Sequence, residues 1–345
     1  EKGVCDYCYE YDRLVQKRIF TGHDGEQRLQ KLVSDIKEKG KNKEYDCIIG
    51  VSGGVDSSFV AYKTKELGLR PLAVHLDNGW NSELAVKNIE EILNKLNIEL
   101  YTYVIDWEEF KSLQLSFLKA SVVDIEVLTD HAIMAAMFKA AKKNGIKYII
   151  GGDNFVTESP MPKTWIYAKW DIRNIKGINK KFGNRNIVTF PTYGLFDIIL
   201  TQYILKYRYV EILNYIDYNK QEAIKVLQDQ LNWRYYGGKH YESIFTKFYQ
   251  AYILPTKFGI DKRKAHFSSL IRSGQISREE ALEEIKMPLY DPGVLREETE
   301  YVLKKFGLSE VEFENIMRLP VRSHLDYPNS LEIFNFLLRL KRIFD

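Results

Sequence analysis

Cysteine is scarce in this chain, and its scarcity excludes one class of protein. Only three cysteines occur among 345 residues, and two of them form the sequence Cys5-Asp-Tyr-Cys8. An extracellular protein held together by disulfides would carry more cysteines at this length. Two thiolates at this spacing can supply half of a tetrahedral zinc site, and a chance pair of reduced thiols is the alternative. Both alternatives remain open at the level of sequence.

Long apolar runs and a strong net charge are also missing. No run approaches the roughly 20 apolar residues that span a bilayer. With 45% hydrophobic and 28% charged residues, the composition is typical of a soluble protein, which we expect to be cytoplasmic and without a membrane contact. Fifty Lys and Arg residues nearly balance 47 Asp and Glu residues, leaving a net charge of +3. This small charge argues against a nucleic-acid partner, because polyanions bind strongly basic surfaces.

The beginning of the chain lacks an initiator methionine and the apolar core of a signal peptide. We therefore expect the natural protein to extend upstream of residue 1. After this start, the charged stretch 12–39 has helical periodicity, and Lys39-Gly40-Lys41-Asn42 predicts a break.

Short apolar runs then alternate with amphipathic segments. Strands of the buried parallel kind are expected at residues 46–51, 70–77, 98–105 and 147–150. Helices are expected at 56–67, 83–96 and 129–144, the last capped by Thr129 and Asp130. This alternation predicts an α/β fold with a doubly wound parallel sheet.

Beyond about Thr192 the strand pattern fades and helical periodicity dominates. Helices are expected at 196–209, 220–231, 242–254, 263–272, 277–285, 293–306, 309–317 and 330–344. We therefore predict three parts in the chain. They are an N-terminal segment with the cysteine pair (1–42), a sheet domain (43–192) and a mainly helical C-terminal region (193–345).

Three polar clusters fall at the expected carboxyl ends of the strands. They are Ser52–Ser58, Asp77–Trp80 and Gly151–Asn154. Ligands of parallel α/β sheets bind at this edge, so we expect the clusters to form one site.

The first cluster, Ser-Gly-Gly-Val-Asp-Ser-Ser, lies at a strand-to-helix turn. Gly53 and Gly54 let the backbone approach a phosphate closely, and the serines supply hydroxyl groups. The following helix directs its free N–H groups and positive dipole end toward an anion. The loop lacks the lysine of a Walker A loop, so it suits pyrophosphate as a leaving group better than γ-phosphoryl transfer. Asp56 there suits a Mg²⁺ ligand or a helix cap.

This segment resembles the PP-loop family, which includes GMP synthetase, asparagine synthetase, NAD synthetase and several tRNA-modifying enzymes. In that family ATP adenylates a carbonyl-type oxygen, and a nitrogen or sulfur nucleophile then displaces AMP. The resemblance implies ATP and Mg²⁺ as ligands. The nucleotide-binding residues that we predict are Ser52, Gly53, Gly54, Val55, Asp56, Ser57, Ser58, Val74, Leu76, Asp77, Gly151, Gly152, Asp153 and Asn154.

The position of the third cysteine helps to select the nucleophile. A sulfur-transferring enzyme needs reactive cysteines near the nucleotide, and no cysteine follows Cys47. Cys47 lies in the strand before the loop, where we expect a packed thiol. Sulfur transfer is therefore disfavoured, although a cluster bound through Cys5 and Cys8 would make it an alternative again, and ammonia is the natural remaining nucleophile. No glutaminase domain is evident, so the ammonia has to come from a partner or from solution.

Three stretches of the second half resemble the N-acetyl sugar amidotransferases. They are Trp-Arg-Tyr-Tyr-Gly-Gly-Lys-His-Tyr-Glu-Ser (233–243), residues 257–264 and Met-Pro-Leu-Tyr (287–290), together with His-Leu-Asp-Asn-Gly-Trp (75–80). These bacterial enzymes convert an acetamido group into an acetamidino group for surface-polysaccharide or flagellin sugars. The resemblance implies a nucleotide-linked N-acetyl sugar as substrate. It also implies a HisH-like glutaminase and a HisF-like ammonia-channelling protein as partners.

The resemblance extends to the cysteine pair with one departure. Family members usually carry an earlier Cys-x-x-Cys near the N-terminus, and this chain has none before Cys5. A Zn²⁺ site at Cys5 and Cys8 therefore requires further cysteines upstream.

Basic residues of the second half are expected near the pyrophosphate, where cations stabilise developing charge. A solvated charged face is the alternative for each of them. His240 is a candidate substrate contact or proton shuttle, or a structural histidine, and so is His266. Glu242 is expected to hold Mg²⁺ or to cap a helix. The candidate catalytic residues are Asp56, Lys239, His240, Glu242, Lys262 and Arg263.

Two other functions remain as alternatives. A PP-loop ligase that acts on tRNA would need a basic groove with strongly salt-dependent binding. A nucleotide-binding protein without turnover would use the same loop for regulation or assembly.

Overall fold

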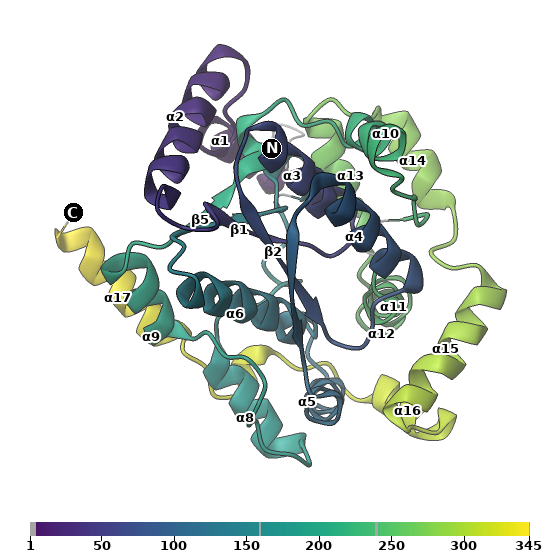
Figure 1. Cartoon of the computed structure of the whole chain (residues 1–345). Coiled ribbons are helices and arrows are strands. Elements are labelled where there is room, and N and C mark those ends of the chain that lie inside the picture. The colour runs from purple at the N-terminus through teal and green to yellow at the C-terminus, as the bar shows by residue number, and fades with distance from the viewer. Residues whose placement is uncertain (1–4, 159, 239–240, 345) are drawn as a thin grey trace.

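A five-stranded parallel sheet forms the centre of the computed structural model, which describes residues 5–158, 160–238 and 241–344, without the side chains of 340–344 (Figure 1). The strands are β1 (Cys47–Gly50), β2 (Pro71–Asp77), β3 (Glu99–Val104), β4 (Tyr148–Gly151) and β5 (Arg208–Glu211). They lie in the order β3-β2-β1-β4-β5, and all pairs are parallel. The predicted α/β fold with a parallel sheet is confirmed.

Hydrophobic cores lie on both faces of the sheet. Ile48 and Val74 belong to one core, whereas Ile49 and Ala73 belong to the other. Adjacent residues separate in this way because successive side chains of a strand point to opposite faces. The central strands are apolar on both sides for this reason, and helices have to cover both faces.

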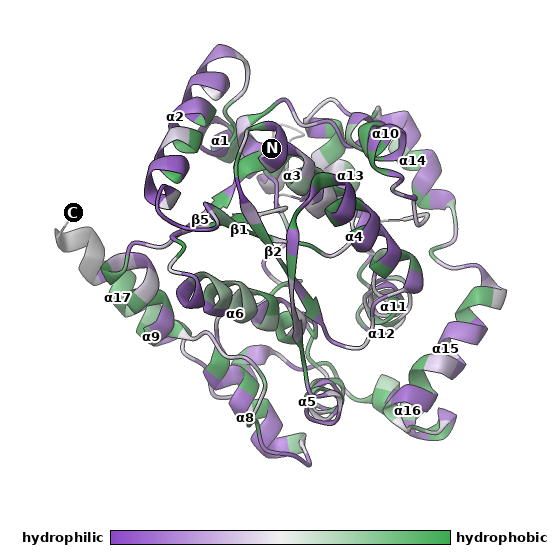
Figure 2. Ribbon diagram, viewed as in Figure 1, coloured by the Kyte–Doolittle hydropathy of each residue, from purple (hydrophilic) through white to green (hydrophobic). Residues whose placement is uncertain are grey.

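One face is covered by four helices with residues in the second core. They are α2 (Gly22–Gly40), α3 (Val55–Glu66), α4 (Glu83–Leu96) and α10 (Lys220–Leu231). The first core contains residues of α5 (Trp107–Ala120), α6 (Val127–Lys143) and α8 (Ile172–Phe182). Figure 2 shows α6 as largely hydrophobic and the outer helix α2 as largely hydrophilic. Burial therefore follows the amphipathic pattern of the helices.

Two predicted helices differ from the structure, and another helix was not predicted. The charged stretch 12–39 forms two helices, α1 (Asp6–Arg18) and α2, separated at residues 19–21. Helix α6 begins two residues earlier than predicted. Its N-cap is Glu126, whose side chain does not cap the first turn of the helix, and Asp130 belongs to that first turn and is not the cap. Helix α5 was not predicted, although Asp106 caps it by accepting from the Glu109 N–H.

The largest correction concerns residues 196–209, where a helix was expected. Helix α9 (Leu195–Ile198) continues only as a π-helical turn, η1 (Ile199–Ile204), and β5 follows. Strand β5 pairs with β4 from Tyr148↔Arg208 to Gly151↔Glu211, so the sheet extends past residue 192. A four-residue edge strand with a single deeply buried apolar residue, Val210, has too little alternation to be recognised in a sequence.

The rest of the chain is helical, as predicted. After β4 and β5 come the short elements α7 (Phe155–Glu158) and η2 (Ile212–Tyr215). The later elements are α11 (Ile244–Phe248), η3 (Tyr249–Ile253), α12 (Leu254–Phe258), α13 (Arg263–Arg272), α14 (Arg278–Lys286), α15 (Pro292–Phe306), α16 (Glu310–Arg318), η4 (His324–Asp326) and α17 (Leu331–Phe344). Within the described part of the chain, no helix is long and apolar enough to cross a membrane.

Candidate functional site

The carboxyl ends of β1 and β4 lie at the point where the strand order reverses, which is the usual ligand position in an open α/β sheet. The loop after β1 leads into α3, and the segment after β4 crosses directly against it. A Cβ atom on Gly152 would lie 3.0 Å from the Ser57 nitrogen and 3.2 Å from the Asp56 carbonyl carbon. Gly152 therefore lets two of the predicted clusters meet.

The loop between β1 and α3 is held by its own polar atoms. The Oγ atoms of Ser52 and Ser57 are 3.1 Å apart, and the Gly54 N–H donates to Ser52 Oγ at 3.3 Å. Gly53 has φ +81°, and a Cβ there would lie 2.5 Å from the carbonyl oxygen of Ala85 in α4. Gly54 is the N-cap of α3 and offers no side-chain cap, so the first N–H groups of α3 face the loop. This geometry suits an anion at the start of the helix.

Residues from the second half lie on this loop. The indole N–H of Trp233 donates to the Gly53 carbonyl oxygen at 2.9 Å, and the Tyr236 hydroxyl accepts from the Val55 N–H at 3.0 Å. The side-chain amide of Asn88 in α4 forms two hydrogen bonds with the backbone of Arg234, at 2.8 and 2.9 Å. The aromatic stretch that resembles the sugar amidotransferases is therefore part of the loop's surroundings.

Two carboxylates frame the loop. Asp56 accepts a hydrogen bond from the hydroxyl of Tyr218, whose pKa is raised by burial and by the Asp56 charge. Glu242 Oε1 lies 3.2 Å from the point that a Cβ of Gly54 would occupy. Mg²⁺ is commonly held by one or two carboxylates together with substrate phosphates, so this donor set fits the ion. In the described ranges, no group of three or more His, Cys, Asp or Glu residues could hold a metal without such a substrate.

The predicted residues of β2 contribute mainly backbone. Val74 and Leu76 are buried in the strand, and the Val74 carbonyl accepts from the Val51 N–H at 3.0 Å. Asp77 ends the strand, and its Oδ1 accepts from the Gly79 N–H at 2.9 Å. Trp80 is fully buried and packs against other aromatic rings, so it fills the core and does not line the nucleotide site.

The end of β4 contributes one accessible acid and one structural amide. Asp153 accepts a hydrogen bond from the Tyr209 hydroxyl and is exposed at the surface. The protein around its carboxylate removes part of the carboxylate's hydration, and this desolvation, followed by the charge of Glu158, raises its pKa to about 6. Asn154 is buried, and its Oδ1 accepts from the N–H and the hydroxyl of Thr157, both at 2.9 Å. Asn154 therefore shapes the segment, and Asp153 is the group that a ligand can meet.

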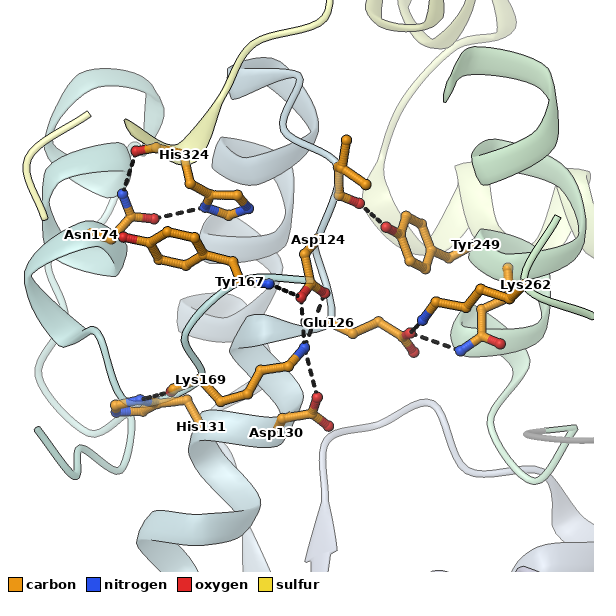
Figure 3. A network of polar contacts seen from close by, with 12 residues as sticks. Asp124, Glu126, Asp130, His131, Tyr167, Lys169, Asn174, Tyr249, Lys262 and His324 are labelled. Carbon is orange, nitrogen blue, oxygen red and sulfur yellow. Dashed lines mark hydrogen bonds and ion pairs between the residues drawn. The ribbon is translucent and has the colours of Figure 1, made fainter. Parts of the chain in front are cut away.

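A network of ion pairs flanks the start of α6, shown in Figure 3. Lys262, expected near the pyrophosphate, has its Nζ 3.1 Å from Glu126 Oε2. Lys169 Nζ lies 2.8 Å from Asp124 Oδ2 and 2.9 Å from Asp130 Oδ2. The Asn78 amide donates to the Thr129 hydroxyl at 3.4 Å, which connects this network with the turn after β2. None of the partners Asp124, Glu126, Asp130 and Lys169 was predicted as a site residue.

The remaining basic candidates are placed differently. Arg263 pairs with Asp261 at 2.9 Å and donates to the carbonyl oxygens of Glu284 and Met287, so it closes the C-terminus of α14. His266 Nδ1 lies 3.3 Å from the Thr157 carbonyl oxygen. Lys239 and His240 lie outside the residues that the structure describes.

The cysteine pair stands at the beginning of α1. The Sγ atoms of Cys5 and Cys8 are 3.5 Å apart, and hydrogen bonds from Cys8 lower the pKa of Cys5. Two thiols are two ligands short of a tetrahedral zinc site, and the described residues bring no third metal ligand to them. These residues alone therefore do not fit a zinc centre. The third cysteine, Cys47, is fully buried in β1.

Sequence patterns missed four aromatic residues of the site: Tyr218, Trp233 and Tyr236 at the loop, and Tyr209 at Asp153. Trp233 and Tyr236 belong to a stretch that the family resemblance had marked, although without a role for either. Tyr209 lies in the unpredicted strand β5 and Tyr218 follows that strand, and no local periodicity indicates their contacts with Asp153 and Asp56.

Two family models match separate parts of the chain. Residues 27–161 match the model described as NAD synthase. Residues 242–341 match the model described as LPS biosynthesis protein WbpG-like, C-terminal domain. The first match contains all three predicted clusters, and the second begins at Glu242.

Curated relatives match shorter segments. The chain is 38% identical over 64 residues to tRNA(Ile)-lysidine synthase of Chlamydia pneumoniae, which covers 18% of this chain and 20% of that protein. It is 35% identical over 91 residues to 7-cyano-7-deazaguanine synthase of Sulfurimonas denitrificans, covering 25% and 38%. The chain thus spans well under half of the length of either relative.

Similar solved structures include two synthetases. NMN synthetase from Francisella tularensis has a TM-score of 0.31 at 24% identity, over 39% of this chain and 57% of that one. NH3-dependent NAD synthetase from Campylobacter jejuni subsp. jejuni has a TM-score of 0.30 at 19% identity, over 60% and 85%.

Proposed function

We propose that the chain is an ATP-dependent amidotransferase, because one part of it matches the NAD synthase model and another matches the WbpG-like C-terminal domain model. Its substrate would be an N-acetyl sugar, linked to a nucleotide, whose acetamido group becomes an acetamidino group. The pathway would be the synthesis of bacterial lipopolysaccharide, O-antigen or flagellin glycans. ATP and nucleotide sugars are cytoplasmic metabolites, so the proposal places the reaction in the cytoplasm.

One observation supports this proposal most strongly. The loop that would hold the ATP phosphates is contacted by the segment that leads into the WbpG-like domain, through Trp233 and Tyr236. Glu242, the first residue of the WbpG-like match, also lies beside Gly54, which supports a site formed by residues of both matched parts. A protein that only bound a nucleotide would not need the second half of the chain at its phosphate loop.

The chemistry follows from the poor leaving ability of an amide oxygen. The acetamido oxygen would attack the α-phosphorus of ATP, and the bond to pyrophosphate would break. Ammonia would then add to the carbon of the O-adenylyl imidate, and AMP would leave. The N–H groups at the start of α3 would hold the pyrophosphate, and Asp56 and Glu242 would bind the Mg²⁺ that offsets its charge.

We further propose that ammonia comes from a HisH-like glutaminase through a HisF-like protein. The described part of the chain has one cysteine near the site, Cys47, and this thiol is fully buried, where burial raises its pKa. A glutaminase nucleophile needs an accessible thiolate, so Cys47 is not suited to that reaction.

A Zn²⁺ site at Cys5 and Cys8 remains a proposal for the natural protein with further cysteines upstream. The pair would be structural, and no step of the reaction depends on it. Elemental analysis of the full-length protein is the test. A zinc content well below one ion per chain would leave the two thiols without a metal role.

Pyrophosphate release from ATP tests the function directly. The assay combines ATP, Mg²⁺ and ammonium chloride with a panel of nucleotide-linked acetamido sugars. We expect release of pyrophosphate and AMP with at least one of them, and a product one mass unit lighter than the sugar substrate. Release with tRNA alone would favour the tRNA ligase, whereas no release with any acceptor would leave a nucleotide-binding protein.

A further inference from the structure

The hydroxyl group of Tyr236 lies at the position where the proposed pyrophosphate site begins. It accepts a hydrogen bond of 3.0 Å from the N–H of Val55, the first residue of α3. A Cβ atom on Gly54 would come within 3.3 Å of the same hydroxyl. The phenol therefore stands over the glycine turn, beside N–H groups that are suited to bind an anion.

This hydroxyl has a proton that it does not use within the described residues. A tyrosine hydroxyl can donate one hydrogen bond as well as accept, and the Val55 N–H supplies only the accepted one. A phenol has an ordinary pKa of about 10, so this hydroxyl keeps its proton at neutral pH. A protonated phenol at this position is a donor for a phosphate oxygen.

The ring is also held in place. Its edge packs against Trp233, with centroids 5.5 Å apart and planes at 77°. Trp233 is itself buried and fixed by its hydrogen bond to the Gly53 carbonyl oxygen. A donor whose position is fixed before the ligand binds loses little conformational entropy when the hydrogen bond forms.

We propose that the Tyr236 hydroxyl donates a hydrogen bond to the pyrophosphate part of ATP and stabilises it as the leaving group. This role rests on the proposed function. When the acceptor oxygen bonds to the α-phosphorus, the bond from that phosphorus to the bridging oxygen breaks, and its electron pair moves onto pyrophosphate. Tyr236 keeps its proton throughout and shares it with the oxygen that gains the charge.

The test compares Tyr236→Phe with Tyr235→Phe by isothermal titration calorimetry. The control is matched, because Tyr235 is the neighbouring ring in the same stretch but is 45% exposed. The ligands are inorganic pyrophosphate, ATP and AMP, each with Mg²⁺. We expect Tyr236→Phe to weaken pyrophosphate and ATP binding about tenfold or more, which is typical of a lost hydrogen bond to a charged group. AMP binding should be unchanged, and Tyr235→Phe should match the wild type.

The pattern over the three ligands distinguishes the alternatives. A purely structural role in supporting the loop would weaken AMP and pyrophosphate alike and would overturn the proposal. Unchanged or tighter pyrophosphate binding by Tyr236→Phe would overturn it too, because the hydroxyl would then be neutral or obstructive. If the wild-type protein bound neither ATP nor pyrophosphate, the proposed function itself would fail.

Discussion

The phosphate loop and the start of α6 lie at the same edge of the sheet, but the loop offers neutral hydrogen-bond donors, whereas the start of α6 holds charged side chains in ion pairs. The loop presents neutral N–H and hydroxyl groups, and none of the residues Ser52–Ser58 is a lysine or an arginine. At the start of α6, two lysines are already paired with the carboxylates Asp124, Glu126 and Asp130 (Figure 3).

This difference separates an anion site from a region whose charges compensate one another. A ligand can bring its own charge to the loop, since the N–H and hydroxyl groups there are neutral and only exchange hydrogen bonds when they bind it. At α6 a charged ligand would have to compete with existing ion pairs that are partly or fully buried. We therefore expect mutations in the loop to change ligand binding, and mutations in the α6 network to change the free energy of unfolding.

The largest expected effect is on stability, from Lys169→Met. Removing this ammonium leaves the buried carboxylate of Asp124 beside Asp130 without compensation, which should cost about 4 kcal/mol. Lys262→Met is the matched variant. Glu126 keeps its hydrogen bond from Gln250 at 2.8 Å, so a loss of about 2 kcal/mol is expected. Urea unfolding measures both, and equal losses would contradict the different roles of the two lysines.

The second prediction tests the loop through Asp56→Ala. Loss of a proposed magnesium ligand should reduce pyrophosphate release about 100-fold while the fold is kept, because the phosphate charge is no longer offset. Asp24→Ala is the control, since Asp24 also lies in the first turn of a helix but on the surface. Near-normal turnover by a folded Asp56→Ala protein, judged by circular dichroism, would remove Asp56 from the mechanism.

The third prediction concerns pH and the side of the network next to Tyr167. His324 stacks on Tyr167 with ring centroids 4.2 Å apart, and burial lowers its pKa to about 4 from 6.5. The unfolded chain takes up the proton more readily, so this stability is complete above pH 6.5 and is lost as the pH falls toward 4. The loss should approach about 3 kcal/mol.

His324→Phe keeps an aromatic ring and should flatten this part of the stability profile between pH 6.5 and 4. The exposed residue His23 supplies the control, and His23→Gln should retain the wild-type slope. Chemical unfolding at a series of pH values gives the comparison. A His324→Phe profile parallel to the wild type would show that another group causes the pH dependence.

The smallest effect is expected at a lysine that pairs with rings instead of carboxylates. Lys305 Nζ lies 4.6 Å from the Trp80 ring centroid and 4.7 Å from that of Trp107, and it donates to the Gly79 carbonyl oxygen. Lys305→Met should cost about 1 kcal/mol and change tryptophan fluorescence. Lys305→Arg should preserve most of the stability, and equal losses in both variants would argue against the cation–π contact.

Much of the sheet could be predicted because its signals are local. The apolar strands β1, β2 and β4 and the glycine turn after β1 each occupy a few consecutive residues, and strand ends of a parallel sheet meet by topology. Strand β5 was not predicted, because a four-residue edge strand shows almost no alternation of apolar and polar residues. Its place is determined by pairing with β4, which is a long-range contact.

The surroundings of the loop were harder to predict for a related reason. Tyr218 contacts Asp56 over a separation of 162 residues, and Tyr236 contacts Val55 over 181. Neither the sequence spacing nor the residue types of Tyr218 and Tyr236 predict these contacts. Arg263 shows the converse, because a basic residue in a marked stretch serves the end of α14.

The order of the contacts along the chain has a consequence for biosynthesis. The loop is complete by Ser58, but the residues that fix it, Trp233 and Tyr236, are translated some 175 residues later. During translation the phosphate loop therefore leaves the ribosome before the two residues that hold it in place have been synthesised. In a stalled nascent chain that ends before Trp233, the loop would lack its contacts with Trp233 and Tyr236. We therefore expect such a chain to bind nucleotide weakly and the ability to bind it to appear late in translation.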